Sequence, residues 1–81
     1  MEKYVTRLAL VDKMIKRQST GTPKELSDKL QISESTVFRL LRTMKESMSL
    51  KIEWHPGHNS YVYRPDSIKF NLEKLILSAQ E

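Results

Sequence analysis

The stretch that decides the fold is QISESTVFRLLRTMKE, residues 31–46. Ser33 is a favourable helix N-cap, and apolar side chains recur at helical spacing after it. These are Val37, Leu40, Leu41, Met44 and, just beyond the quoted stretch, Met48. The pattern predicts an amphipathic helix over about 34–47, whose other surfaces carry hydroxyl, aromatic and cationic side chains.

Upstream of this stretch, an amphipathic helix is predicted over residues 3–18. Its apolar positions fall at steps of four, three and four, with Met14 beside them: Tyr4, Leu8, Val11 and Ile15. Gly21 is expected to end this helix, because glycine readily adopts the left-handed conformation found at helix C-termini.

A second helix is announced by Thr22-Pro23-Lys24-Glu25. The threonine is an N-cap, the proline occupies the first helical position, where no N–H is needed, and the glutamate completes a capping box. This helix must end within a residue or two of Leu30, because a new N-cap follows at Ser33. A turn of about three residues therefore joins the second helix to the third.

After Ser49 the periodicity of the apolar residues changes from near 3.6 to 2. Alternating apolar residues precede a Pro56-Gly57 turn, and a run of strand formers follows it: Tyr61, Val62 and Tyr63. This predicts a hairpin with strands near 50–55 and 60–64. Further on, the apolar spacing predicts a short strand through residues 68–72 that leads into a short C-terminal helix.

Length and composition narrow the function classes. A chain of 81 residues makes one domain and buries only about 60% of its unfolded surface. Fourteen Lys and Arg against ten Asp and Glu give a net charge of +4, a mild bias toward polyanionic partners. There is no cysteine, glycine-rich phosphate loop or catalytic constellation. We therefore expect a cytoplasmic non-enzyme without cofactor, metal, membrane span or small-molecule substrate.

This order of elements resembles the winged helix-turn-helix DNA-binding domains, in particular the DeoR-type and BirA-type N-terminal domains of bacteria. The resemblance covers residues 4–64, and the residues that carry it are Leu26-Ser27, Leu30, Ile32-Ser33, Thr36-Val37, Arg39 and Leu41. Ser27 stands where alanine is usual, and Gln31 replaces the usual turn glycine. The second departure costs about 1 kcal/mol if that residue must be left-handed.

The resemblance implies an α+β, mainly α fold: a three-helix winged helix-turn-helix with a β-hairpin wing and a short C-terminal strand and helix extension. It divides the chain into a winged helix-turn-helix domain at residues 1–65 and an extension at 66–81. It also implies that the third helix is the recognition helix.

The residues of the third helix support DNA binding on physical grounds. From Ser35 to Lys45 it carries three cations and no acid. A helix fits the major groove, where arginine bonds guanine in bidentate fashion and hydroxyls bond phosphates or base edges. Positive helix N-termini favour phosphate as well. The expected partner is double-stranded DNA, and the expected contacts are Thr22, Ser33, Glu34, Ser35, Thr36, Phe38, Arg39, Arg42, Lys45, His58 and Asn59.

Two residues of this helix have a second interpretation. Phe38 either packs under the hairpin or touches a thymine methyl or a sugar. Glu34 either favours the helix dipole, which is the simpler account, or accepts a hydrogen bond from cytosine N4.

The aromatic and histidine side chains of the hairpin are each interpreted first as structural residues or as residues of the wing. Three aromatics are expected to cover the buried face of the sheet, with contact to the DNA backbone as the alternative: Trp54, Tyr61 and Tyr63. His55 and His58 have an H-x-x-H spacing but no third Cys or Asp ligand nearby, so no zinc site is expected. His58 is instead expected to join a wing that approaches phosphates, together with Lys51, Asn59 and Arg64.

One recognition helix contacts only a few base pairs, which selects poorly among the sites of a genome. We therefore expect a homodimer, with residues 68–76 as the first candidate for its interface and the N-terminal helix as the second. The expected role is transcription regulation. A protein-interaction module, a DNA-architectural accessory factor of a mobile element and an RNA-binding protein are the alternatives.

Overall fold

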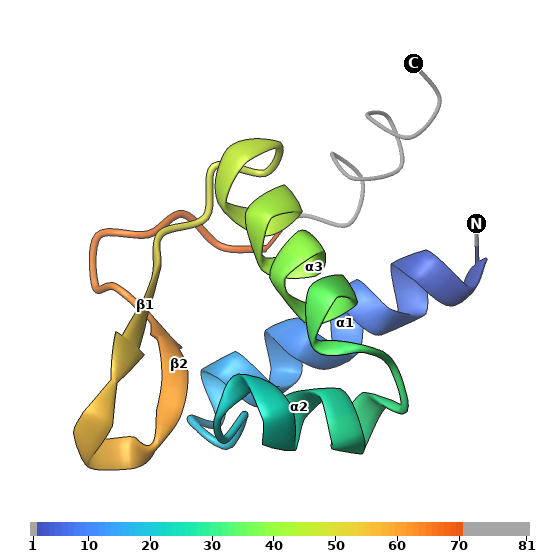
Figure 1. The fold of residues 1–81 in the computed structure, drawn as a ribbon. Helices are drawn as coiled ribbons and strands as arrows, with labels where there is room; N and C mark the ends of the chain where they lie inside the picture. Colours follow the sequence, from blue (N-terminus) through green and yellow to red (C-terminus); the bar gives the residue numbers. More distant parts are fainter. Residues whose placement is uncertain (1, 71–81) are drawn as a thin grey trace.

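The computed structural model describes residues 2–70, with side chains from Tyr4 onward. The chain runs through α1 (Glu2–Lys16), α2 (Pro23–Leu30), α3 (Glu34–Glu46), β1 (Ile52–His55), a 3-10 turn (Pro56–His58) and β2 (Ser60–Tyr63). Figure 1 shows α1 and α3 crossing, α2 below them and the hairpin beside α3. The predicted α+β, mainly α winged helix-turn-helix fold is confirmed.

The core lies between the three helices and the base of the hairpin. It contains the predicted apolar stripes of the helices together with the first residues after α3: Leu8, Val11, Ile15, Leu26, Val37, Leu40, Leu41, Met44, Met48, Leu50 and Ile52. Tyr4, the first residue of the predicted stripe, is exposed, and its hydroxyl donates to Thr43 Oγ1 over 3.1 Å. The core therefore holds α3 by one face and leaves its opposite face to solvent.

The predicted starts of α2 and α3 are confirmed in atomic detail. Thr22 Oγ1 accepts from the Glu25 N–H over 3.2 Å, and Glu25 Oε1 accepts from the Thr22 N–H over 3.0 Å, which completes the capping box. Pro23 occupies the first position of α2. Ser33 caps α3 by accepting from the Thr36 N–H over 3.2 Å.

The end of α1 differs from the prediction, whereas α2 ends at Leu30 and the turn of three residues before α3 is as predicted. Gly21 does not end α1, because the chain leaves the helix after Lys16 and Gln18 adopts the left-handed conformation, with φ 55°. Bonds from Gln18 N to Ile15 O and from Ser19 N to Met14 O form a Schellman motif.

The same motif ends α2. Gln31 has φ 58°, its N–H donates to Asp28 O, and the Ile32 N–H donates to Ser27 O. Gln31 is therefore left-handed, the conformation for which the usual turn glycine is suited. The turn that places α3 thus stores backbone strain.

Replacing Gln31 with glycine should raise the free energy of unfolding by about 0.5 to 1 kcal/mol, because glycine adopts positive φ without a steric penalty. Urea denaturation followed by circular dichroism measures the change. Ser47→Gly is the matched control, since Ser47 also lies at a helix end but has φ −80°. This control should lose stability, and an equal gain in both variants would contradict the assignment of strain to Gln31.

The hairpin pairs Ile52 with Tyr63 and Trp54 with Tyr61, so these four side chains share one face of the sheet. Ile52 is buried, but Trp54 is 39% exposed. The prediction that Trp54 covers the buried face is therefore wrong. In β1 only Ile52 is buried, whereas Tyr61 and Tyr63 of β2 pack against the core. Trp54 instead contacts Tyr61 edge-to-face, with ring centroids 5.2 Å apart.

Tyr63 ties the wing to α1. Its hydroxyl donates to Asp12 Oδ1 over 2.6 Å, and Asp12 also pairs with Lys16 over 3.1 Å. Burial, together with the bond to the Asp12 carboxylate, raises the pKa of Tyr63 well above that of an exposed tyrosine.

The raised pKa predicts a loss of stability at alkaline pH. Above about pH 10 the unfolded chain releases the tyrosine proton, whereas the folded chain keeps it. The free energy of the unfolded state therefore falls relative to that of the folded state as the pH rises. Stability should be constant with respect to this group below pH 10 and fall above it. Denaturation of wild type and Tyr63→Phe between pH 8 and 11.5 checks this. A decline of equal slope in both proteins would contradict it.

After β2 the chain turns through Arg64–Ser67, with the Ser67 N–H donating to Arg64 O over 2.9 Å. Residues 68–70 are not in a strand, so that part of the predicted strand is wrong. The rest of it, and the predicted C-terminal helix, lie outside the described residues. Phe70 packs against the core, whereas Ile68 is exposed.

Candidate nucleic-acid interface

The outward face of α3 carries the predicted cationic side chains. Successive helical residues are rotated by about 100°, so Ser35, Arg39 and Arg42 lie opposite the buried Val37 and Met44. All three outward residues are exposed. Lys45 is exposed as well and lies on the flank nearer the hairpin, where it lines a groove with Tyr61.

The cations on this face form no ion pair within residues 4–70. The ion pairs found there join Lys16 to Asp12 and both Lys51 and Arg64 to Asp66, and none involves a cation of α3. Lys51 and Arg64, which were expected in the wing, therefore share one carboxylate. The cations of α3 keep their charge available for a polyanion.

Two acidic residues reduce the positive electrostatic potential of α3. With Glu34 and Glu46 against Arg39, Arg42 and Lys45, the helix has a net charge of +3 − 2 = +1. Glu34 lies in the first turn, where it favours the helix dipole. Glu46 lies one turn beyond Arg42 on the outward face, and the prediction of contacts overlooked it although the helical spacing places it there.

The hydroxyl groups at the start of α3 differ in whether they form hydrogen bonds within the protein. Ser33 Oγ accepts from the Thr36 N–H and also lies 2.9 Å from Thr36 Oγ1, so this pair serves the cap. Ser35 is exposed and forms no side-chain hydrogen bond within the described residues. Ser35 is thus the hydroxyl of this turn best placed to meet a partner.

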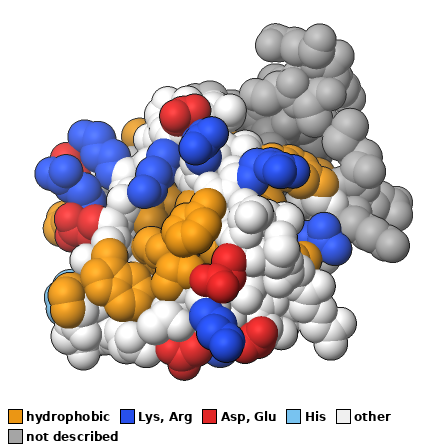
Figure 2. All heavy atoms as spheres, in the orientation of Figure 1, with side chains coloured by type: hydrophobic (Ala, Val, Ile, Leu, Met, Phe, Trp, Pro, Cys, Tyr) orange, Lys and Arg blue, Asp and Glu red, His pale blue; other side chains and the backbone are white. Residues whose placement is uncertain are grey.

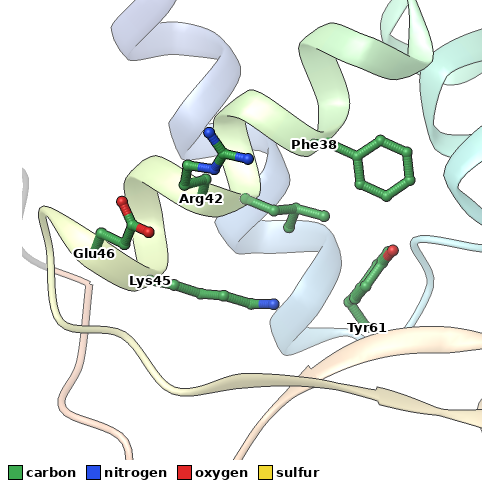
Figure 3. Close-up of a pocket in the computed structure, with 6 residues that line it drawn as sticks. Phe38, Arg42, Lys45, Glu46 and Tyr61 are labelled. Atoms are coloured by element: carbon green, nitrogen blue, oxygen red, sulfur yellow. The ribbon is translucent and has the colours of Figure 1, made fainter.

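A groove of about 410 Å³ separates α3 from the hairpin and is lined by Phe38, Leu41, Arg42, Lys45, Glu46 and Tyr61. Figure 3 shows the rings of Phe38 and Tyr61 close together at one end and Glu46 at the other. Phe38 is 51% exposed, so it does not pack under the hairpin. Burial raises the pKa of Tyr61.

The groove opens onto a larger apolar surface. Figure 2 shows hydrophobic side chains in a continuous patch over α3 and the hairpin, bordered by both basic and acidic side chains. Phe38 lines the groove with Tyr61, and Trp54 contacts Tyr61; both Phe38 and Trp54 are exposed. An exposed apolar patch of this kind, bordered by charge, is typical of interaction sites.

The tip of the wing lies against the start of α2. Asn59 has φ 51°, and its Nδ2 donates to Glu25 Oε1 over 3.1 Å. The Thr22 N–H, the Asn59 amide and the Thr22 hydroxyl all act to lower the pKa of Glu25. The predicted contacts Thr22 and Asn59 are therefore brought together through Glu25, whose carboxylate sequence reasoning assigned only to the cap.

The two histidines support each other in the turn of the wing. The His58 N–H donates to His55 Nδ1 over 3.2 Å, and the two ring centroids are 4.4 Å apart. His58 itself is exposed. In the part of the chain that the structure describes, no group of three His, Cys, Asp or Glu residues is arranged for a metal ion. Within the same part, no helix is long and apolar enough to cross a membrane.

Comparison with known protein families agrees with this arrangement. Residues 8–47, which run from the first turns of α1 to the end of α3, match the IclR helix-turn-helix domain. Comparison with curated proteins and with solved structures gives no significant match. The winged helix-turn-helix resemblance is thereby confirmed, but its DeoR or BirA subtype is not.

Proposed function

Residues 8–47 form an IclR-type helix-turn-helix domain, a DNA-binding domain of transcription regulators, and from this premise we propose that the chain is a sequence-specific regulator that binds duplex DNA through α3. The observation that carries the proposal is the outward face of α3, where Arg39 and Arg42 are exposed and free of ion pairs within the described residues. In this proposal α3 lies in the major groove and the hairpin lies over the adjacent backbone.

Each part of the surface has a proposed role. Arg39 and Arg42 contact guanine edges or phosphates, and Lys45 contacts a phosphate on the flank. Ser35 and the N-terminus of α3 bind phosphate or a base edge. The supporting contacts proposed around them are Thr22, Ser33, Glu34, Thr36, Phe38, His58 and Asn59.

A salt titration tests duplex binding without knowledge of the target sequence. Affinity for a random-sequence duplex, measured by fluorescence anisotropy, should be micromolar or weaker. The logarithm of the association constant should fall with the logarithm of salt concentration at a slope near −3 to −5, as expected for about four to five neutralised phosphates. Binding that is absent at 50 mM salt, or insensitive to salt, would refute the proposal.

We also propose that the chain acts as a homodimer, because one recognition helix discriminates too few base pairs. Ile68 is exposed and is the first member of the apolar stripe of residues 68–76, which we assign to the interface. Sedimentation velocity at tens of micromolar, with and without duplex, is the test. A monomer under both conditions would contradict this assignment.

The exposed apolar patch supports one second candidate, a protein-interaction module. In that case Phe38 and Trp54 anchor a partner protein, while Arg42 pairs with its acidic side chains. The two candidates differ in the salt titration, because an interaction module has no reason to bind random duplex with the slope of several released counterions.

A further inference from the structure

We infer that Phe38 reads the C5-methyl group of a pyrimidine, that of thymine in unmodified DNA, within about two base pairs of the base that Arg42 contacts. The inference rests on the proposed function and specifies which feature of the duplex the domain selects. It assigns a role in sequence specificity to Phe38, a residue that lies outside the buried core of the fold.

Phe38 stands apart from the other apolar residues of α3. Val37, Leu40, Leu41 and Met44 are each at most 3% exposed, whereas Phe38 is 51% exposed. Its ring lines the groove together with Tyr61, which itself contacts Trp54, and Figure 3 shows the rings of Phe38 and Tyr61 near each other. An exposed aromatic ring at this position presents an apolar surface on the helix that carries the cations.

The major groove offers one kind of apolar feature to such a ring. Its edges are hydrogen-bond donors and acceptors except for the C5-methyl group of thymine. Methylated cytosine places a methyl group at the same carbon. A phenyl ring cannot bond to the polar edges, so its favourable contact in the groove is a methyl group.

The position of the methyl follows from the helix. Phe38 and Arg42 are four residues apart, which separates them by about 6 Å along the axis and turns them by only about 40° about it. Base pairs are about 3.4 Å apart along the duplex. The two side chains, which are both exposed, therefore reach bases about two pairs apart.

A protein partner on Phe38 is the competing explanation of the exposed ring. Such a partner would cover a surface that Arg42 and Lys45 also border, since all three residues line the same groove. It would therefore compete with DNA for α3. The continuity of the ring with the cationic face is the reason why we assign it to the duplex.

The experiment starts with the full 81-residue chain and a random pool of duplexes from which preferred sites are selected. Each thymine of the selected site is then replaced by deoxyuridine, which removes the methyl group and keeps every hydrogen-bonding atom. At one thymine the affinity should fall about fourfold, the effect of one buried methyl group. At that position 5-methylcytosine should bind about fourfold better than cytosine.

Phe38→Ala decides whether the ring is responsible. This variant should bind the thymine and deoxyuridine duplexes equally, and circular dichroism should show an unchanged fold. Leu10→Ala, which trims another exposed apolar side chain on α1, should keep the fourfold difference. The inference is overturned if no thymine is sensitive, or if the difference persists in Phe38→Ala. Salt-dependent, sequence-selective binding that survives these results would leave the proposed function intact, whereas absence of any selected duplex would refute both.

Discussion

Replacing Arg39 and Arg42 together with alanine is expected to weaken binding to a selected duplex by about 2 to 6 kcal/mol, because a good arginine contact to a base contributes about 1 to 3 kcal/mol. Both side chains are exposed and belong to the face of α3 opposite the core. Their removal should therefore leave the thermal unfolding midpoint almost unchanged. Fluorescence anisotropy with the selected duplex and with a scrambled one measures the two affinities.

The salt dependence separates the two kinds of contact. If one of these arginines binds a phosphate, the slope of log affinity against log salt becomes shallower by about 1 in its single variant. If it binds a base, the slope changes little and preference at one position of the site relaxes. The single variants therefore assign each residue to backbone or base.

A matched control removes the same charge elsewhere. Lys13 and Arg17 are exposed, on α1 and in the loop that follows it, and neither is in an ion pair within residues 4–70. Lys13→Ala with Arg17→Ala also lowers the net charge by two, but it should reduce affinity only slightly. Equal losses in the two double variants would mean that net charge and not α3 drives binding. Full affinity in Arg39→Ala with Arg42→Ala would place the DNA site on another surface.

The starts of α2 and α3 were predictable from sequence, but the end of α1 was not. Thr22 and Ser33 announce α2 and α3 because a cap is a local hydrogen bond between neighbours in the chain. Gln18 carries no such signal, since a left-handed residue other than glycine is tolerated only where the surrounding structure outweighs its strain. Gly21 also has positive φ, and for this reason the left-handed residue at the end of α1 was predicted three residues after its actual position, Gln18.

In the candidate interface, too, local features were predictable from sequence and long-range contacts were not. The outward position of Arg39 and Arg42 follows from the helical period alone. The bond between Asn59 and Glu25 joins residues 34 apart in sequence, and no local pattern predicts it. Trp54 fits the alternation of a half-buried strand, yet its exposure depends on where the core ends, which is a property of the assembled fold.

The contact that most deserves a stability measurement was also invisible in sequence: replacing Thr20 with valine should lower the free energy of unfolding by about 2 to 4 kcal/mol. Thr20 and Ser60 are both completely buried. The Thr20 N–H donates to Ser60 Oγ over 3.0 Å, and Thr20 Oγ1 accepts from the Tyr61 N–H over 2.8 Å. These bonds join the loop before α2 to β2.

Valine keeps the size of threonine but removes the oxygen, so the Tyr61 N–H loses its acceptor and the Ser60 hydroxyl loses a neighbour 3.0 Å away. Each polar group left unsatisfied in the interior costs about 1 to 3 kcal/mol. Thr20→Ser keeps the oxygen and loses only a methyl group, which corresponds to about 1 kcal/mol. Urea denaturation of both variants gives the comparison, and equal losses would show that packing rather than hydrogen bonding dominates at this position. A larger loss in Thr20→Val would mean that the hydrogen bonds between Thr20 and β2 hold the wing to the helices. In that case the backbone amides of Trp54 and Tyr61 should also exchange faster in Thr20→Val than in Thr20→Ser.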